Sequence, residues 1–512
     1  MTTISDDITT PERPLSPPER LARPGIQFTG WVRVLVFVGA ALAATLAVVS
    51  GIGVVAGGSK AQIVTPIAVG VGVLLGLLAI TRFKMFVLLV LALRASVDIT
   101  RVSGHSAGST ATNGAAKAGD PSTILALVLI VTAIVWLLAQ FRREGRLPTL
   151  RVRQVLLLFF VSGLLSILAS SNPGPSAVQA LRLLAVVMMY IVAEQLAREE
   201  VNRRQLVVAC FASSLFPLLL TAEGFATGHP RSELKGTFTR IIGTFTQSND
   251  FGIYLMFLII MGVAVYPHLE RRWRWPMRIL LVGWTGCCVL TYTRSALIGV
   301  VLGLLVIGIF QSKRILLIMA IGAVVALALV PALASRFTSL TQANNVQVVN
   351  GKVALNQNSL SWRFNYWTQI LPLANRSPVI GIGLGETQYS TTQTKQPHND
   401  YVKAYVETGV AGLLAYVLLQ ITLLTMTNKA RKKALRGTWD YGVAVGALGC
   451  CVAFLAVSFV ANVIGSVVNV WYLFVFVAAA VAPMLPRVPL DDAKPGSVRE
   501  LPPAGAATAG TR

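Results

Sequence analysis

Long apolar runs, separated by short polar loops, constrain the fold of this 512-residue chain more than any other feature. Most runs are close to the roughly 20 residues that an α-helix needs to cross a bilayer. Because backbone polar groups find no water partners inside lipid, such runs must be helical. We therefore expect an all-α polytopic membrane protein with about 12–14 transmembrane helices, drawn from the runs 31–55, 62–80, 84–98, 122–141, 154–170, 177–196, 205–223, 251–267, 279–293, 295–310, 315–334, 400–427, 442–461 and 467–485.

The composition excludes several classes of protein. Hydrophobic residues make up 54% of the chain and charged residues 13%, about half the charged share of a soluble domain. A soluble enzyme, a disordered protein and a fibrous protein are therefore excluded. The net charge of +23 would suggest nucleic acid in a soluble protein. Here most Lys and Arg residues lie in short loops, so we expect the lipid bilayer, and no nucleic acid, as a partner.

Basic residues concentrate in every second short loop. Cytosolic loops of membrane proteins carry an excess of Lys and Arg, so these loops and both chain ends are predicted to be cytosolic. The alternate loops 56–61 and 171–176 carry few or no basic residues and are predicted to face outside. The basic segments are 82–84, 142–153, 198–204, 271–278, 313–314 and 429–436.

Five regions follow from this reading. Residues 1–29 are polar and rich in proline, and residues 487–512 are rich in Pro, Ala and Gly, so both are predicted to be disordered cytosolic tails. Residues 30–334 would hold the first eleven transmembrane helices and residues 400–486 the last three. Residues 335–399 would form an extracytoplasmic loop. All five cysteines lie in apolar runs, which argues against disulfides and Cys-ligated metals.

The external loop 335–399 is far longer than a connection between two helices requires. Residues 346–353 predict a β-hairpin around the Asn350-Gly351 turn. Residues 359–374 place apolar side chains at i, i+4 spacing, which predicts an amphipathic helix resting on the outer membrane interface. A long structured loop of this kind suggests a lid over an external site.

The predicted topology brings Arg240, Arg294, Arg363 and His398 to the outer face. An arginine near hydrocarbon normally has an anionic partner, and a ligand phosphate would match the planar fork of its guanidinium. For Arg182, which lies inside a span near the outer side, snorkelling and contact with a lipid phosphate both stay open. Nearby external carboxylates are few, namely Glu223, Glu233, Asp250, Glu386, Asp400 and Glu407.

The most informative stretch runs from His398 to Gly412. On a continuous helix one face would carry His398, Tyr401, Tyr405, Gly409 and Gly412. The glycines would allow a neighbouring helix to approach closely. His398 would then lie at the mouth of the packed seam, where a general base can work.

This stretch resembles the O-antigen ligase and polymerase superfamily. The family pattern is His, then Asn, Ser or Gln, nine residues, Gly, two residues, and Gly, Thr or Tyr. His398-Asn399, Gly409 and Gly412 fit it without a gap.

Three other segments carry the same resemblance. Arg240, Gly243 and Asn249 are similar to the family's Arg-x-x-Gly…Asn segment. Residues 291–294 are similar to its Thr-x-Ser-Arg segment, with a threonine in place of the usual serine. Residues 361–385 are similar to its external loop. The resemblance covers roughly residues 180–430 in the family's order.

The resemblance implies a GT-C-like glycosyltransferase in the bacterial inner membrane, acting on the extracytoplasmic side. The donor would be a glycan on undecaprenyl pyrophosphate, and the acceptor a hydroxyl of a glycan or glycolipid. No metal or other cofactor is implied. Arg240 and Arg294 would hold the donor pyrophosphate and stabilise its growing charge where other enzymes use Mg²⁺, and His398 would activate the acceptor. Further substrate-binding residues would be Arg363, Asn249, Asn399, Tyr401 and Arg182.

Alternatives remain open at this level. A ligase and a polymerase that joins lipid-linked repeat units share these motifs. A small-anion transporter should show internal symmetry and paired broken helices, and the sequence has no repeat, which favours the enzyme. Asp250 and Asp400 are either catalytic carboxylates or partners of the cations.

Overall fold

The computed structural model describes residues 75–99, 121–235, 238–329, 345–349, 352–356, 359–391 and 395–486. The predicted span 31–55, most of 62–80, and both predicted tails lie outside the described residues. Helices form nearly all of the regular structure: α3 (Phe83–Val97), α5 (Pro121–Glu144), α6 (Arg151–Ser166), α7 (Pro173–Leu196), α8 (Glu200–Ala212), α9 (Leu215–Ala226), α10 (Ser248–Val265), α11 (Arg271–Leu290), α12 (Arg294–Phe310), α13 (Arg314–Leu329), α15 (Ser359–Ile370), α16 (Asp400–Lys433), α17 (Trp439–Val457) and α18 (Val467–Val481).

Within the described part of the chain, 8 helical segments are long and apolar enough to cross a membrane. A ninth, Arg294–Phe310, is equally apolar but shorter. The predicted all-α polytopic class is therefore confirmed. The eight are Thr123–Glu144, Arg151–Ala169, Pro173–Leu196, Glu200–Ala226, Ser248–His268, Asp400–Lys433, Trp439–Val457 and Val467–Met484.

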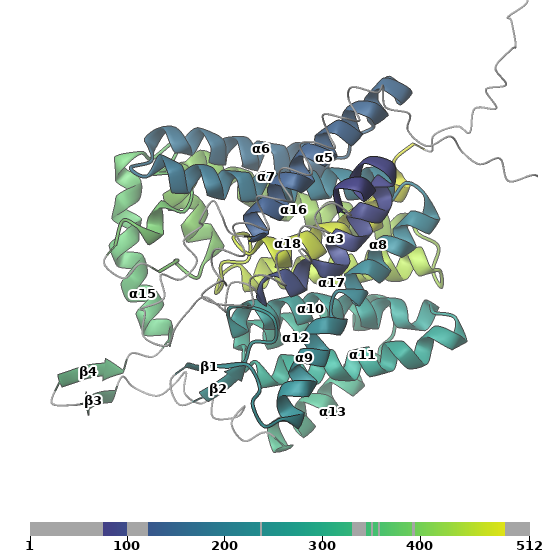
Figure 1. Ribbon diagram of the computed structural model, residues 1–512. Coiled ribbons are helices and arrows are strands. Elements are labelled where there is room, and N and C mark those ends of the chain that lie inside the picture. The colour runs from purple at the N-terminus through teal and green to yellow at the C-terminus, as the bar shows by residue number, and fades with distance from the viewer. Residues whose placement is uncertain are drawn as a thin grey trace, which may run out of the picture.

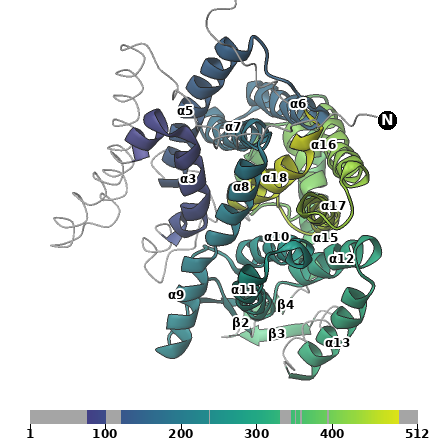
Figure 2. The same cartoon turned by 90° about the vertical axis from the view of Figure 1, so that its right-hand side faces the viewer.

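Helix α17 lies at the centre of the bundle. In Figure 2 it is seen nearly end-on, with α16 and α18 on one side and α10 and α12 on the other. Its small residues allow this crowding. A Cβ atom at Gly449 would lie 3.0 Å from the backbone oxygen of Gly303 in α12, and one at Gly446 would lie 2.8 Å from the sulfur of Met261 in α10.

One end of the bundle, here called the basic end, gathers the arginine-rich connections. Contacts across neighbouring helices tie this end together. The side chain of Arg203 in α8 donates to both oxygens of Asp440 in α17. The hydroxyl of Tyr441 in α17 donates to the backbone oxygen of Phe310 at the end of α12. These contacts bring the start of α8, the end of α12 and the start of α17 together at this end, and all three adjoin basic segments.

The opposite end, here called the site end, carries the longer connections. Two antiparallel hairpins lie there, together with α15 (Figure 1). Strand β3 (Asn345–Val349) pairs with β4 (Lys352–Asn356), which confirms the predicted hairpin. Strand β1 (Ser232–Lys235) pairs with β2 (Phe238–Ile241) so that Glu233 lies opposite Arg240. The sequence does not predict this second hairpin, because its strands are short and polar.

Short 3₁₀ turns extend several helices: η1 (Ile167–Ala169), η2 (Tyr266–His268), η3 (Leu371–Arg376), η4 (Glu386–Gln388) and η5 (Ala482–Met484). The predicted amphipathic helix over 359–374 is present as α15, and it passes into η3 at Leu371. Pro372 lacks a backbone N–H, which favours this change of helix type. The apolar face of α15 and η3 is buried in the protein, since Tyr366, Ile370 and Ala374 have no exposed surface.

Candidate functional site

Arg240 is buried in strand β2, where it joins three segments of the site end. Its Nε donates to the backbone oxygen of Thr291 at 2.7 Å. Its Nη2 donates at 2.8 Å to both Asn249 Oδ1 and Thr293 Oγ1. The carboxylate of Glu233 lies 4.0 Å from Nη1. Arg240 therefore fixes the turn 291–293 against the start of α10, and it brings the predicted residue Asn249 into the same cluster.

Arg294 follows this turn and is the first residue of α12, with a half-buried side chain. Tyr292, the middle residue of the turn 291–293, has a φ of 49°, a left-handed conformation that is unfavourable for a bulky residue. Thr293 accepts from Arg240 and donates to the backbone oxygen of Ser248 at 3.2 Å. A threonine thus supplies the hydroxyl that the family's usual serine would supply. The turn is held in one strained geometry directly before Arg294.

His398 lies between two tethered residues. Pro397 accepts a hydrogen bond from the indole of Trp367 at 2.7 Å, and the backbone N–H of Asn399 donates to Asn462 Oδ1 at 3.2 Å. The ring of Trp362 meets the imidazole edge-on, with 5.8 Å between centroids. His398 itself has a φ of 50°. Among the described residues, Tyr292 and His398 are the only non-glycine residues with positive φ, and strain of this kind concentrates at functional sites.

Helix α15 supports the loop around His398. The hydroxyl of Tyr366 donates to the backbone oxygen of Thr387 at 3.2 Å and contacts Lys395. The ammonium of Lys395 lies 5.0 Å from the centre of the Trp362 ring. Arg363 is half-buried in the same helix, and burial lowers the pKa of its guanidinium. A cation held away from water attracts an anion more strongly than an exposed one.

The other predicted residues have mainly structural contacts. Asn399 caps α16, since its Oδ1 accepts from the backbone N–H groups of Tyr401 and Val402. Tyr401 donates to the backbone oxygen of Leu455 at 3.2 Å. Arg182 in α7 donates to Thr123 Oγ1 at 3.2 Å.

Arg182 also lies near η4. Burial raises the pKa of Tyr389, as does the charge of Glu386, while the positive charge of Arg182 opposes that rise. Glu386 accepts from Asn172 Nδ2 at 2.7 Å and from Ser170 Oγ at 3.1 Å. These contacts fix the loop after residue 385 against the end of α6 and the start of α7.

Helix α16 is interrupted at Gly409, which has φ 67° and ψ −169°. The predicted continuous face from His398 to Gly412 is therefore wrong: residues 400–408 form a short half-helix, and His398 precedes it. A Cβ atom at Gly409 would lie 2.2 Å from the backbone oxygen of Val379, so only glycine fits there.

The segment 377–385 fills this break. The N–H groups of Ile382 and Gly383 donate to the backbone oxygens of Val406 and Glu407 at 3.1 and 3.0 Å, and Val410 donates to Pro378 at 2.9 Å. Backbone groups at membrane depth need such partners. The glycine-rich turn therefore packs back against α16.

Helix α17 links the two clusters. A Cβ atom at Gly299, near the start of α12, would lie 3.0 Å from Val457 at the end of α17. The next residue, Ser458, accepts a hydrogen bond from the backbone N–H of Asp400 at 2.8 Å. The Arg240–Arg294 cluster and the His398 segment thus flank one end of the same helix.

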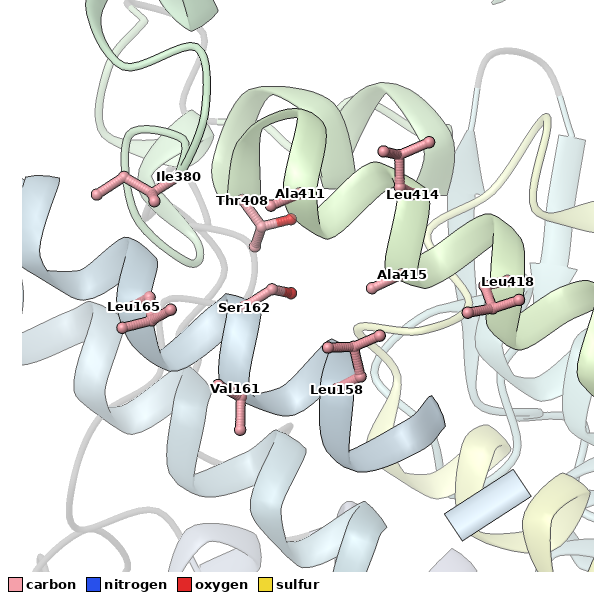
Figure 3. Close-up of a pocket in the computed structure, with 10 residues that line it drawn as sticks. All are labelled: Leu158, Val161, Ser162, Leu165, Ile380, Thr408, Ala411, Leu414, Ala415 and Leu418. Atoms are coloured by element: carbon pink, nitrogen blue, oxygen red, sulfur yellow. The ribbon is translucent and has the colours of Figure 1, made fainter. Parts of the chain in front are cut away.

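An apolar groove of about 240 Å³ lies beside the break, between α6 and α16 (Figure 3). The only side-chain hydroxyls on its wall are those of Ser162 and Thr408, and both donate to backbone oxygens of their own helices. The groove is therefore suited to hydrocarbon. Its lining residues are Leu158, Val161, Ser162, Leu165, Ile380, Thr408, Ala411, Leu414, Ala415 and Leu418.

The fold and these clusters define a multi-pass membrane protein with arginines and a strained histidine segment at one end of its bundle. A family model described as O-antigen ligase matches residues 279–417, which include Arg294, Arg363, His398 and Gly409. The chain is also similar to the exopolysaccharide production protein ExoQ of Rhizobium meliloti, at 25% identity over 262 residues.

That alignment covers 46% of this chain and 57% of the relative, so it spans little more than half of the relative's length. Both matches support the resemblance to the O-antigen ligase-like superfamily that the motifs predict. The helices show a multi-pass membrane protein.

Sequence reasoning missed the roles of several buried polar residues. Glu386 and Glu407 were recognisable as carboxylates on the outer face, but their partners come from distant segments. Glu407 accepts from the backbone N–H of Gly385 at 2.8 Å and from the hydroxyl of Thr387. The sequence signal that could have indicated a structural role for Glu407 is its position two residues before Gly409.

Proposed function

We propose that the protein transfers a glycan from a polyprenyl pyrophosphate carrier to an acceptor hydroxyl on the extracytoplasmic side of the bacterial inner membrane. The observation that carries this proposal is the placement of Arg294 and His398. Both lie in the matched family region and both lie at the site end. His398 has a left-handed backbone conformation, and so has Tyr292, two residues before Arg294. A chain that keeps two strained segments at one end is expected to use them.

In the proposed reaction the acceptor oxygen attacks the anomeric carbon of the donor sugar. A new C–O bond forms, and the bond between that carbon and the pyrophosphate oxygen breaks. The acceptor proton passes to the imidazole of His398, acting as general base. The leaving pyrophosphate takes the electron pair, and the guanidinium of Arg294 stabilises its growing charge. The reaction needs no metal ion in this scheme, and we assign Arg363 on α15 to the donor as a second cation.

Arg240 takes a different role in this proposal from the one that the family resemblance implies. Its guanidinium is 2% exposed and donates to Thr291, Thr293 and Asn249. We assign it the task of positioning the turn before Arg294, so that it acts on the donor through that turn. Asn249 supports the turn before Arg294 through Arg240, and Asn399 supports the start of α16. We assign Arg182, which lies near Tyr389, to contact with the glycan of the substrate.

The proposal is tested with purified protein and a chemically defined lipid-linked glycan donor. Turnover is measured in the presence of EDTA for the native chain and for Arg294→Ala. We expect native turnover to survive EDTA and the variant to lose most of it. Complete loss of native turnover in EDTA, with recovery on adding Mg²⁺ or Mn²⁺, would contradict the arginine mechanism.

A polymerase is the second candidate, because the similar protein from Rhizobium meliloti is named for exopolysaccharide production. A ligase moves a finished glycan to another acceptor, whereas a polymerase joins repeat units on the carrier. Deletion of the gene separates them. An accumulated full-length glycan on the carrier indicates a ligase, and an accumulated single repeat unit indicates a polymerase.

The membrane orientation is tested with a matched pair of cysteines. Thr227 is exposed at the site end, and Leu435 is exposed at the basic end. We expect a membrane-impermeant maleimide to label Thr227→Cys from outside intact spheroplasts and Leu435→Cys only after lysis. The reverse pattern would place the site end in the cytosol and remove the extracytoplasmic assignment.

A further inference from the structure

The half-helix 400–408 is separated from the rest of α16 by the break at Gly409. The half-helix begins two residues after His398, so the placement of the half-helix determines where the imidazole lies. An isolated helix of about two turns is not stable by itself. Contacts with the surrounding segments must therefore hold it, and two buried carboxylates supply them, one at each end.

Asp400 holds the beginning of the half-helix and has no exposed surface. Its Oδ2 accepts from the backbone N–H groups of Val463 and Ile464 at 3.0 and 3.2 Å. The hydroxyl of Tyr416, which lies beyond the break, donates to the same oxygen at 3.2 Å. Asp400 thus joins the first turn after His398 to the connection between α17 and α18 and to the second part of α16.

Glu407 holds the end of the half-helix and is 1% exposed. Both of its carboxylate oxygens accept from the external loop, one from the backbone N–H of Gly385 at 2.8 Å and one from the hydroxyl of Thr387. Thr387 belongs to η4, and its backbone oxygen accepts from Tyr366 in α15. Glu407 thus joins the half-helix to the loop that carries Trp362 beside His398.

Lys403 lies between the two carboxylates on the same half-helix. It is 8% exposed. Its ammonium donates to Gln396 Oε1 at 3.2 Å and lies 4.0 Å from Glu407 Oε2. A buried carboxylate without such partners would be costly. The half-helix therefore carries its own compensating charge, and its carboxylates stay bound to neutral donors at both ends.

We propose that Asp400 and Glu407 are positioning residues that together fix the imidazole of His398 relative to the external loop. The proposal rests on the proposed catalytic role of His398 for its effect on turnover, but its structural part does not. It assigns to Asp400 a positioning role, because three donors from beyond the half-helix bind its Oδ2 and thereby fix the first turn after His398. It also accounts for a glutamate two residues before the obligatory glycine.

The test uses Asp400→Asn and Glu407→Gln, which remove the charges and keep the shapes. Glu223→Gln is the matched control, since Glu223 is an exposed carboxylate of α9 at the same end. The chain has only 4 histidines, so selective labelling with ¹³C,¹⁵N-histidine gives few signals. The signal of His398 is assigned as the one that His398→Gln lacks. Turnover and the donor KM are measured on the same preparations.

We expect the His398 signal to shift or broaden in both variants and to be unchanged in the control, with the other histidine signals unchanged in all. We expect turnover to fall about 10- to 100-fold, as the loss of a buried charged hydrogen-bond acceptor predicts. The KM for the donor should stay within about threefold of the native value, since Asp400 and Glu407 do not bind the donor in this proposal. An unchanged His398 signal in both variants would overturn the positioning role.

A shifted His398 signal with native turnover would keep the positioning role and reject the catalytic role of His398, so the two failures are distinguishable. Should either variant fail to fold, Thr387→Val and Tyr416→Phe each remove one donor and leave the carboxylates in place. We expect a smaller shift of the same His398 signal in both. No shift in these folded variants would count against the proposal.

Discussion

The two ends of the bundle use their carboxylates in different ways. At the basic end Glu144 pairs with Arg198 at 2.7 Å and Glu200 with Arg204 at 2.8 Å. At the site end Asp400, Glu407 and Glu386 bind backbone N–H groups, hydroxyls or a side-chain amide. Among the described contacts of these three carboxylates with a cation, the shortest joins Lys403 Nζ to Glu407 Oε2 at 4.0 Å. A close pair of Arg94 and Asp98 in α3 is the exception at that end.

This difference indicates what each end is built to do. At the basic end close ion pairs join neighbouring segments, such as the end of α5 and the connection after α7 through Glu144 and Arg198. At the site end Asp400, Glu407 and Glu386 instead accept from neutral donors, and these contacts hold the half-helix and the loop after residue 385 in place.

Two glycines with positive φ give the largest expected contrast between the ends. Gly409 has a φ of 67° and faces the backbone oxygen of Val379, whereas Gly437 at the basic end has a φ of 83° and open space around it. An alanine in the left-handed region costs about 1–2 kcal/mol, and Gly409→Ala adds a backbone clash. We expect Gly409→Ala to lose most folded protein on size exclusion, and Gly437→Ala to fold. Equal yields would show that the break in α16 is not required.

Arg294→Ala is expected to have a larger effect on turnover than Arg240→Gln or Glu144→Gln. Loss of a charge-assisted phosphate contact costs about 2–4 kcal/mol, or roughly 30- to 1000-fold in rate. Arg294→Lys keeps the charge and loses the planar fork, so it should recover little. Steady-state turnover at equal folded concentration is the measurement. Near-native turnover of the lysine variant would mean that charge alone suffices.

Arg240→Gln should have an intermediate effect, because it removes donors to Thr291 and Thr293 without removing Arg294. Unmet buried acceptors cost about 1–3 kcal/mol, so we expect a lower melting temperature in detergent together with a loss of about tenfold in turnover. The loss should be small in an Arg294→Ala background, since both changes affect the same contact. Additive losses would instead indicate that Arg240 contacts the donor independently.

Glu144→Gln at the basic end should have the smallest effect. It breaks the partly exposed pair with Arg198, and such pairs contribute about 1 kcal/mol or less. We expect a small fall in melting temperature, native turnover and an unchanged donor KM. A loss of turnover comparable with that of Arg240→Gln would remove the distinction between the ends.

Much of the fold follows from the sequence because lipid leaves few choices. Apolar runs of bilayer length must be helices, and the alternation of basic loops places the connections at two ends. The break at Gly409 does not follow, because glycines such as Gly446 and Gly449 also lie within the unbroken helix α17. The break depends on hydrogen bonds from residues 377–385, which lie far enough from α16 in sequence that no local pattern reports them.

The candidate site shows the same limit. Arg240, Arg294 and His398 stand out in the sequence because polar residues at the ends of apolar runs are unusual. Whether such an arginine meets a ligand or the protein depends on its partners. Arg240 binds the turn at Thr291 and Thr293, some 50 residues further along the chain, and this contact is visible only in three dimensions.

The central claim is that His398 and Arg294 together carry glycan transfer at the site end. Its most direct test is the turnover of a defined lipid-linked donor by purified native protein, His398→Ala, His398→Gln and Arg294→Ala at equal folded concentration. The account predicts that the native chain transfers the glycan in EDTA and that both His398 variants are inactive, because glutamine cannot accept the proton. Near-native turnover by both His398→Ala and Arg294→Ala would contradict it.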